Sequence, residues 1–152
     1  MSSAVSAALI FGLYAFVGVA AVVGSITLTQ RFFKPRAEQV GYGLFLIAVA
    51  GFYSVFTAYF GADGAWPLEL RAIVAFCVMG LVGTRFAPAI IVGYPLHGIW
   101  DFLHELQQHG GFAAFDPGTV TPTPLAYGAF CAVYDFGIAG YFLHRRQAWA
   151  SA

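Results

Sequence analysis

The sequence carries very little charge for its length. Only 9% of its 152 residues are Asp, Glu, Lys or Arg, whereas charged residues make up about 25% of a typical soluble domain. Seven basic and seven acidic residues give a formal net charge of zero, which argues against nucleic acid as a partner. A chain that is 60% hydrophobic cannot cover its apolar surface in water with so few charges. The composition therefore predicts an integral membrane protein.

Cysteine is scarce as well. Cys77 and Cys131 both lie in apolar segments, so we expect two small buried hydrophobic residues and no disulfide framework. The sequence also lacks a phosphate-binding loop, a nucleophile elbow, paired CxxC motifs and a haem-attachment motif. The first apolar segment has no preceding Lys or Arg and is too long for the core of a signal peptide, so it is predicted to be a retained span.

Long apolar segments take up most of the chain. Crossing a hydrocarbon core of about 30 Å requires about 20 mostly apolar residues in a helix. The candidate spans are residues 5–29, 40–61, 68–84, 88–106 and 124–144, with a polar loop over residues 107–122. The sequence thus predicts an all-α fold, with residues 1–152 forming one compact domain of about five transmembrane helices. Glycine recurs along the spans and indicates close helix packing, within the chain or in a homo-oligomer or larger membrane complex.

The basic residues predict how the chain is oriented in the membrane. With five spans, one face of the bundle holds six of the seven basic residues, namely Arg31, Lys34, Arg36, Arg85, Arg145 and Arg146. Only Arg71 falls on the opposite face. The positive-inside rule places the crowded face in the cytoplasm. We therefore expect the N-terminus outside and the C-terminus in the cytoplasm, most simply in a bacterial inner membrane.

Ionisable residues inside the last two spans form the candidate site. His97, Asp101 and His104 are spaced at i, i+4 and i+7, so they project from one face of the fourth span. At 1.5 Å per residue, Asp135 lies at about the depth of His97 if the fifth span returns antiparallel. Ionisable groups at this depth are costly and usually functional. If the two spans face each other, these four residues form one patch.

This patch is compatible with three roles. Two imidazoles and two carboxylates suit Zn²⁺, Fe²⁺ or Mn²⁺, so His97, Asp101, His104 and Asp135 are the candidate metal ligands. A His–Asp pair can also carry protons, or the group can be a buried network that fixes helix pairing. On the first hypothesis, Glu105 is a candidate for supporting the metal ligands through a hydrogen bond or for acting as the general base, and Tyr134 is a candidate for orienting a polar group.

The motif in the fourth span resembles that of a known family. The stretch His97-x-x-Trp100-Asp101-x-x-His104 is followed by the loop Thr121-Pro122-Thr123-Pro124 and by a helix with Cys131 and Asp135. This pattern is similar to that of small bacterial multi-span membrane proteins of unknown function, in which the second histidine of the motif is followed directly by a third. Glu105 stands at that position here. The resemblance covers about the last third of the chain and implies that these polar positions belong together, without implying an activity.

These observations lead to one leading hypothesis and two alternatives. The leading hypothesis is a metal-dependent membrane enzyme that acts on a hydrophobic, lipid-like or isoprenoid-like small molecule. The first alternative is a non-catalytic subunit of a larger membrane complex, whose polar network sets helix pairing. The second is a proton or ion pathway in which the His and Asp residues form the relay.

Overall fold

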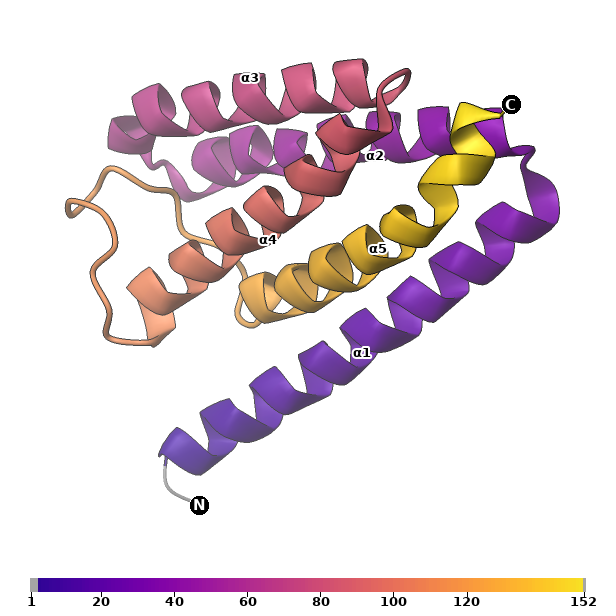
Figure 1. The fold of residues 1–152 in the computed structure, drawn as a ribbon. Coiled ribbons are helices and arrows are strands. Elements are labelled where there is room, and N and C mark those ends of the chain that lie inside the picture. Colours follow the sequence, from indigo (N-terminus) through magenta and orange to yellow (C-terminus); the bar gives the residue numbers. More distant parts are fainter. Residues whose placement is uncertain (1–2, 152) are drawn as a thin grey trace.

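The computed structural model describes residues 3–151, and five long α-helices dominate this part of the chain (Figure 1). They are α1 (Ser3–Phe32), α2 (Pro35–Phe60), α3 (Trp66–Gly83), α4 (Ala87–His109) and α5 (Tyr127–Ala150), with a short 3₁₀ helix, η1 (Asp63–Ala65), before α3. No strand occurs among the residues described. The predicted all-α fold with five helices is confirmed, and each helix overlaps one predicted span.

Proline and left-handed residues explain several helix boundaries. A proline stands in the first turn of α2, α3 and α4, where its missing N–H costs no helical hydrogen bond. Gly61 ends α2 in the left-handed conformation, at φ 62°. Ala126 also has a positive φ, 65°, so the chain turns there and α5 begins at Tyr127, three residues later than the sequence indicated.

Three helical segments in the described part of the chain are long and apolar enough to cross a membrane. They are Ala8–Phe32, Pro35–Phe60 and Asp63–Gly83, with mean hydropathies of 2.3, 1.8 and 1.7. The helices α4 and α5 contain 23 and 24 residues, so each is about 35 Å long and has the length to cross as well. Their polar residues lower the hydropathy, and five of these are buried in the protein, namely His97, Asp101, His104, Glu105 and Asp135.

Two helix pairs account for the closest packing, and the buried core lies between α2, α4 and α5. α4 packs most extensively against α5, and α2 packs against α3, while α1 lies along α5 and makes few contacts with α2 (Figure 1). Glycines permit both pairings: a Cβ on Gly98 would lie 3.0 Å from Asp135 Cβ, and one on Gly43 would lie 2.6 Å from the carbonyl oxygen of Gly80. The fourth and fifth spans, whose facing the sequence left open, therefore do face each other.

A buried carboxylate joins three helices at one end of the bundle. Glu38 of α2 accepts hydrogen bonds from the Tyr141 hydroxyl, from Arg145 Nε at 2.7 Å and from Trp149 Nε1 at 3.0 Å, all on α5. The Thr29 hydroxyl of α1 donates to the same carboxylate at 3.2 Å. Because Glu38 is only 1% exposed, these four donors replace the hydration that it loses on burial.

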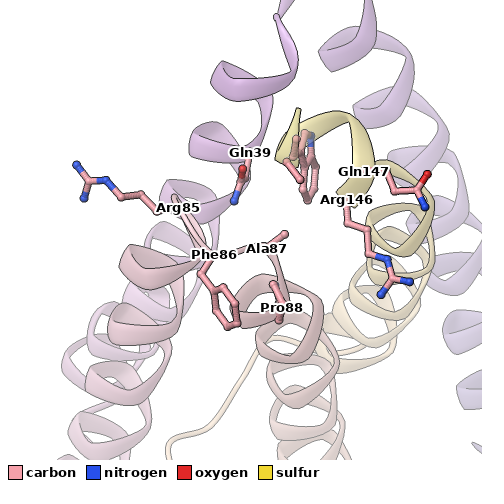
Figure 2. A pocket seen from close by; sticks show the side chains of 9 residues that line it. Gln39, Arg85, Phe86, Ala87, Pro88, Arg146 and Gln147 are labelled. Carbon is pink, nitrogen blue, oxygen red and sulfur yellow. The ribbon is translucent and has the colours of Figure 1, made fainter. Parts of the chain in front are cut away.

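A pocket of about 400 Å³ lies at the same end of the bundle (Figure 2). It is bounded by Gln39 of α2, by Arg85 in the turn between α3 and α4, and by Arg146 and Trp149 of α5. The Gln39 amide donates to the carbonyl oxygen of Gly83 at 2.8 Å, which ties α2 to the end of α3. Arg85 and Arg146, which are far apart in the sequence, therefore line the same pocket.

This clustering leads to a prediction about topology. Reporter fusions after residue 85 and after residue 152 should both report a cytoplasmic location, and a fusion in the loop after α4 should report the outer side, because basic residues are retained in the cytoplasm. At each position, alkaline phosphatase and a fluorescent protein are fused in separate variants, and enzyme activity is compared with fluorescence. Opposite locations for the first two fusions would contradict the five-span topology.

Candidate metal centre

The buried face of α4 carries the polar residues of the site. Its buried residues are Ile90, Gly93, Tyr94, His97, Gly98, Asp101, His104 and Glu105, a spacing that follows the helical repeat. α5 packs along this face, and Gly98 allows it to approach closely enough for Asp135 to reach α4. The helix pairing thus brings a carboxylate of α5 to an imidazole of α4.

His97, Asp101 and Asp135 form a compact buried group. His97 Nδ1 lies 2.9 Å from Asp135 Oδ2 and 3.2 Å from Asp101 Oδ2. One candidate ligand atom from each residue lies within 4.8 Å of the other two. Two donors bound at about 2.1 Å to one ion are separated by about 3.0 Å at right angles and about 3.4 Å in a tetrahedron. The group can therefore hold a metal ion.

Neighbouring side chains orient this group. The Tyr53 hydroxyl of α2 donates a hydrogen bond to Asp101 Oδ1, which turns the other oxygen, Oδ2, towards His97. Asp101 Oδ2 and His97 Nε2 have no hydrogen-bond partner among the described residues. The ring of Phe76 packs edge-on against the imidazole, with centroids 5.0 Å apart. A carboxylate held through one oxygen, with the other turned towards the remaining ligand atoms, fits a metal ligand.

One side of the group formed by His97, Asp101 and Asp135 borders a cavity. A cavity of about 160 Å³ reaches His97 and Asp135 and is otherwise lined by Ala21, Ser25, Phe45, Val49, Phe130, Cys131 and Tyr134. The Tyr134 hydroxyl donates to Ser25 Oγ at 3.2 Å, so this residue, predicted to orient a polar group, does lie beside the site. Catalytic metal centres combine three protein ligands with such an accessible position.

His104, the fourth predicted ligand, lies outside the group. Its Nδ1 is 2.9 Å from the carbonyl oxygen of Trp100, and its Nε2 is 2.9 Å from Glu69 Oε1 of α3. A carbonyl oxygen only accepts, so Nδ1 carries a hydrogen and a further proton lies between Nε2 and Glu69. Both ring nitrogens are therefore engaged, and the side chain joins α4 to α3.

Glu105, the predicted general base, holds the start of α5. Its Oε1 accepts from the N–H of Ala126 at 3.1 Å, and its Oε2 accepts from the N–H of Gly128 at 3.0 Å. These N–H groups lie at the N-terminus of the helix, where a negative charge is favourable. Both oxygens of this buried carboxylate are thus occupied by backbone hydrogen bonds.

The loop between α4 and α5 covers the end of the bundle next to His104. Gln107 accepts from the N–H groups of Ala114 and Phe115, and Gln108 accepts from the N–H of Thr123. Glu69 accepts from the N–H of Thr121 at 2.8 Å. The Phe115 ring then packs on the rings of Trp100 and His104, with centroids 5.4 and 5.5 Å apart. The sequence indicated a polar loop here, and the structure shows that α3 and α4 anchor it.

Two residues of this network were not singled out from the sequence. Tyr53 belongs to the buried stripe of α2 that also contains Tyr42, Leu46, Ala50 and Thr57, and this periodicity was the available signal that it points inward. Glu69 is an acidic residue at the start of an apolar span, which is itself a signal of burial against a partner. Their hydrogen-bond partners on α4 are distant in sequence, so only the tertiary structure shows which residues pair.

Comparisons of the chain with models of known families, with curated proteins and with solved structures find no match. The resemblance carried by His97, Trp100, Asp101 and His104 therefore stays a prediction.

Replacing Glu105 should reveal its part in stability. Glu105→Ala leaves the buried N–H groups of Ala126 and Gly128 without acceptors, so we expect the free energy of unfolding to fall by about 3 kcal/mol. His109→Ala is the control, because that imidazole lies 4.0 Å from the same carboxylate and is partly exposed; it should change stability by less than about 0.5 kcal/mol. Thermal unfolding in detergent measures both. Unchanged stability in Glu105→Ala would contradict the capping role.

Proposed function

We propose that the protein is a metal-dependent membrane enzyme whose centre consists of His97, Asp101 and Asp135. The observation that carries the proposal is the convergence of three buried ligand atoms within 4.8 Å, beside a cavity that reaches two of them. Burial of this kind excludes competing water and strengthens the electrostatic effect of a bound cation.

Charge balance supports a divalent ion in this position. Two carboxylates buried in an apolar bundle are costly unless cations compensate them. A protonated His97 neutralises only one of the two, whereas a divalent ion beside a neutral imidazole neutralises both Asp101 and Asp135. One nitrogen and two oxygen donors suit Zn²⁺, Fe²⁺ or Mn²⁺.

The residues around the centre have separable tasks in this proposal. Such an ion polarises an oxygen of the substrate or lowers the pKa of a bound water. Tyr53 holds Asp101 in position through its hydroxyl. Tyr134 lines the cavity beside Asp135 and places a hydroxyl where it can bind a polar group of the substrate. The substrate is lipid-like or isoprenoid-like, because the cavity lies among apolar helices.

Metal analysis tests the proposal directly. The purified protein should contain about one equivalent of Zn, Fe or Mn, and His97→Ala and Asp135→Asn should each lose most of it, because each removes one of three ligands. Elemental analysis by mass spectrometry after detergent purification measures the content. His104→Gln is the matched control, since it changes a buried histidine of the same helix that lies outside the group. No metal in the wild type, even after reloading, would refute the proposal.

The supporting role of Tyr53 gives a finer test. Tyr53→Phe removes only the hydroxyl that orients Asp101, so metal affinity should fall by about 10-fold to 100-fold without loss of the fold. Competition with a chelator of known affinity measures the change. An unchanged affinity would show that Asp101 does not depend on this hydrogen bond.

One observation also favours a proton pathway as the second candidate. His97 Nδ1 lies at hydrogen-bonding distance from Asp135, and Tyr53 extends the chain of polar contacts through Asp101. Proton flux in reconstituted vesicles that is lost in Asp135→Asn, from a protein that binds no metal, would favour this candidate over the enzyme.

A further inference from the structure

The cavity at the candidate metal centre adjoins a second one, and the two meet at the hydrogen bond between Tyr134 and Ser25. The second cavity has a volume of about 280 Å³ and shares Ser25, Phe45 and Tyr134 with the first. Beyond these shared residues it extends past Leu28 and Gly41 towards Glu38. The two cavities together form what we term the α1–α2 crevice, which runs between these helices and ends at His97 and Asp135.

The α1–α2 crevice lies on the lipid side of the protein. Both helices that border it are long and apolar enough to cross a membrane. α1 makes few contacts with α2, so the space between them is not filled by helix packing. The rings and side chains at its mouth are exposed, with Leu28 57%, Phe33 52% and Phe45 44% accessible. In a bilayer this mouth faces hydrocarbon.

The other approach to the centre is covered. The loop between α4 and α5 is held by Glu69, Glu105, Gln107 and Gln108 through backbone hydrogen bonds. Phe115 of this loop packs on Trp100 and His104, one to two turns beyond His97 on α4. A molecule that reaches His97 therefore has its more open path through the crevice.

The charges along the crevice restrict what can occupy it. No Lys or Arg is among the described residues that line either cavity. Glu38, at the far end, is already paired with Arg145 at 2.7 Å, and the near end holds the carboxylate of Asp135. An anionic head group would meet no basic partner here, whereas an uncharged chain matches the apolar lining.

We propose that the α1–α2 crevice binds the hydrocarbon chain of an uncharged, single-chain lipid-like molecule. The chain enters from the bilayer between α1 and α2 and places its hydroxyl or ester end beside His97, Asp135 and the Tyr134 hydroxyl. The chemistry at that end rests on the proposed function, but occupation of the crevice by the chain does not.

Photolabelling with a diazirine-bearing long-chain alcohol tests the proposal in phosphatidylcholine vesicles. Adducts should concentrate on Leu28, Phe45 and Tyr134, and an excess of the unlabelled alcohol should suppress them. Adducts that are equally dense on Leu44 and Val55, two exposed residues of α2 that line neither cavity, would show ordinary lipid contact and overturn the proposal. Cross-linked dimers through α1 in place of lipid adducts would overturn it as well.

Two glycines on α2 supply a matched pair of variants. A Cβ at Gly41 or at Gly51 would meet no heavy atom within 4 Å, but Gly41 lines the crevice and Gly51 lines neither cavity. Gly41→Phe should lower the suppressible labelling by about tenfold because its ring fills the crevice, and Gly51→Phe should leave it unchanged. Equal labelling in both variants would contradict the proposal.

Metal content measured on the same samples separates the two proposals. Gly41→Phe should keep its metal, because Gly41 lies in the part of the crevice remote from His97. Suppressible labelling in a protein without metal would support binding of the chain in the crevice and refute the metal centre. Full metal content, together with labelling that the unlabelled alcohol does not suppress, would support the metal centre and refute binding of the chain in the crevice.

Discussion

The contact between His97 on α4 and Asp135 on α5 is the constraint on which the rest of the structure depends. Both groups are almost fully buried, and neither can be left unpaired in an apolar bundle without a large cost. Their 2.9 Å approach fixes how the two helices face each other and at what height. Asp101, one turn along α4, thereby also lies next to His97. His97 and Asp135 form the polar end of the cavity beside them.

Most of the acidic residues of this protein are buried. Five of its seven acidic residues are buried: Glu38, Glu69, Asp101, Glu105 and Asp135. Three of them each secure a junction, namely α2 with α5, α3 with α4, and the start of α5. The other two, Asp101 and Asp135, meet at His97, where a protonated imidazole balances only one of the two negative charges. The presence of two carboxylates at one imidazole distinguishes the candidate metal centre from the structural carboxylates.

The surroundings of the centre are asymmetric. On the side of the loop between α4 and α5, backbone hydrogen bonds to α3 and α4 and the Phe115 ring close the bundle. Towards α1, few contacts with α2 leave an apolar crevice that ends at the polar group. The covered face and the cavity therefore lie on different sides of the same residues, and the proposed binding of a hydrophobic molecule rests on this arrangement.

The sequence by itself determined the helices and the face of α4 that carries His97, Asp101 and His104, because apolar length and the 3.6-residue repeat are local properties. It also placed Asp135 at the correct depth, since antiparallel helices of known rise can be aligned by counting. It did not reveal that His104 pairs with Glu69, that Glu105 holds the start of α5 or that Tyr53 orients Asp101. Only the tertiary structure decided these pairings, because several acceptors of similar chemistry compete for each donor and helix packing alone selects among them.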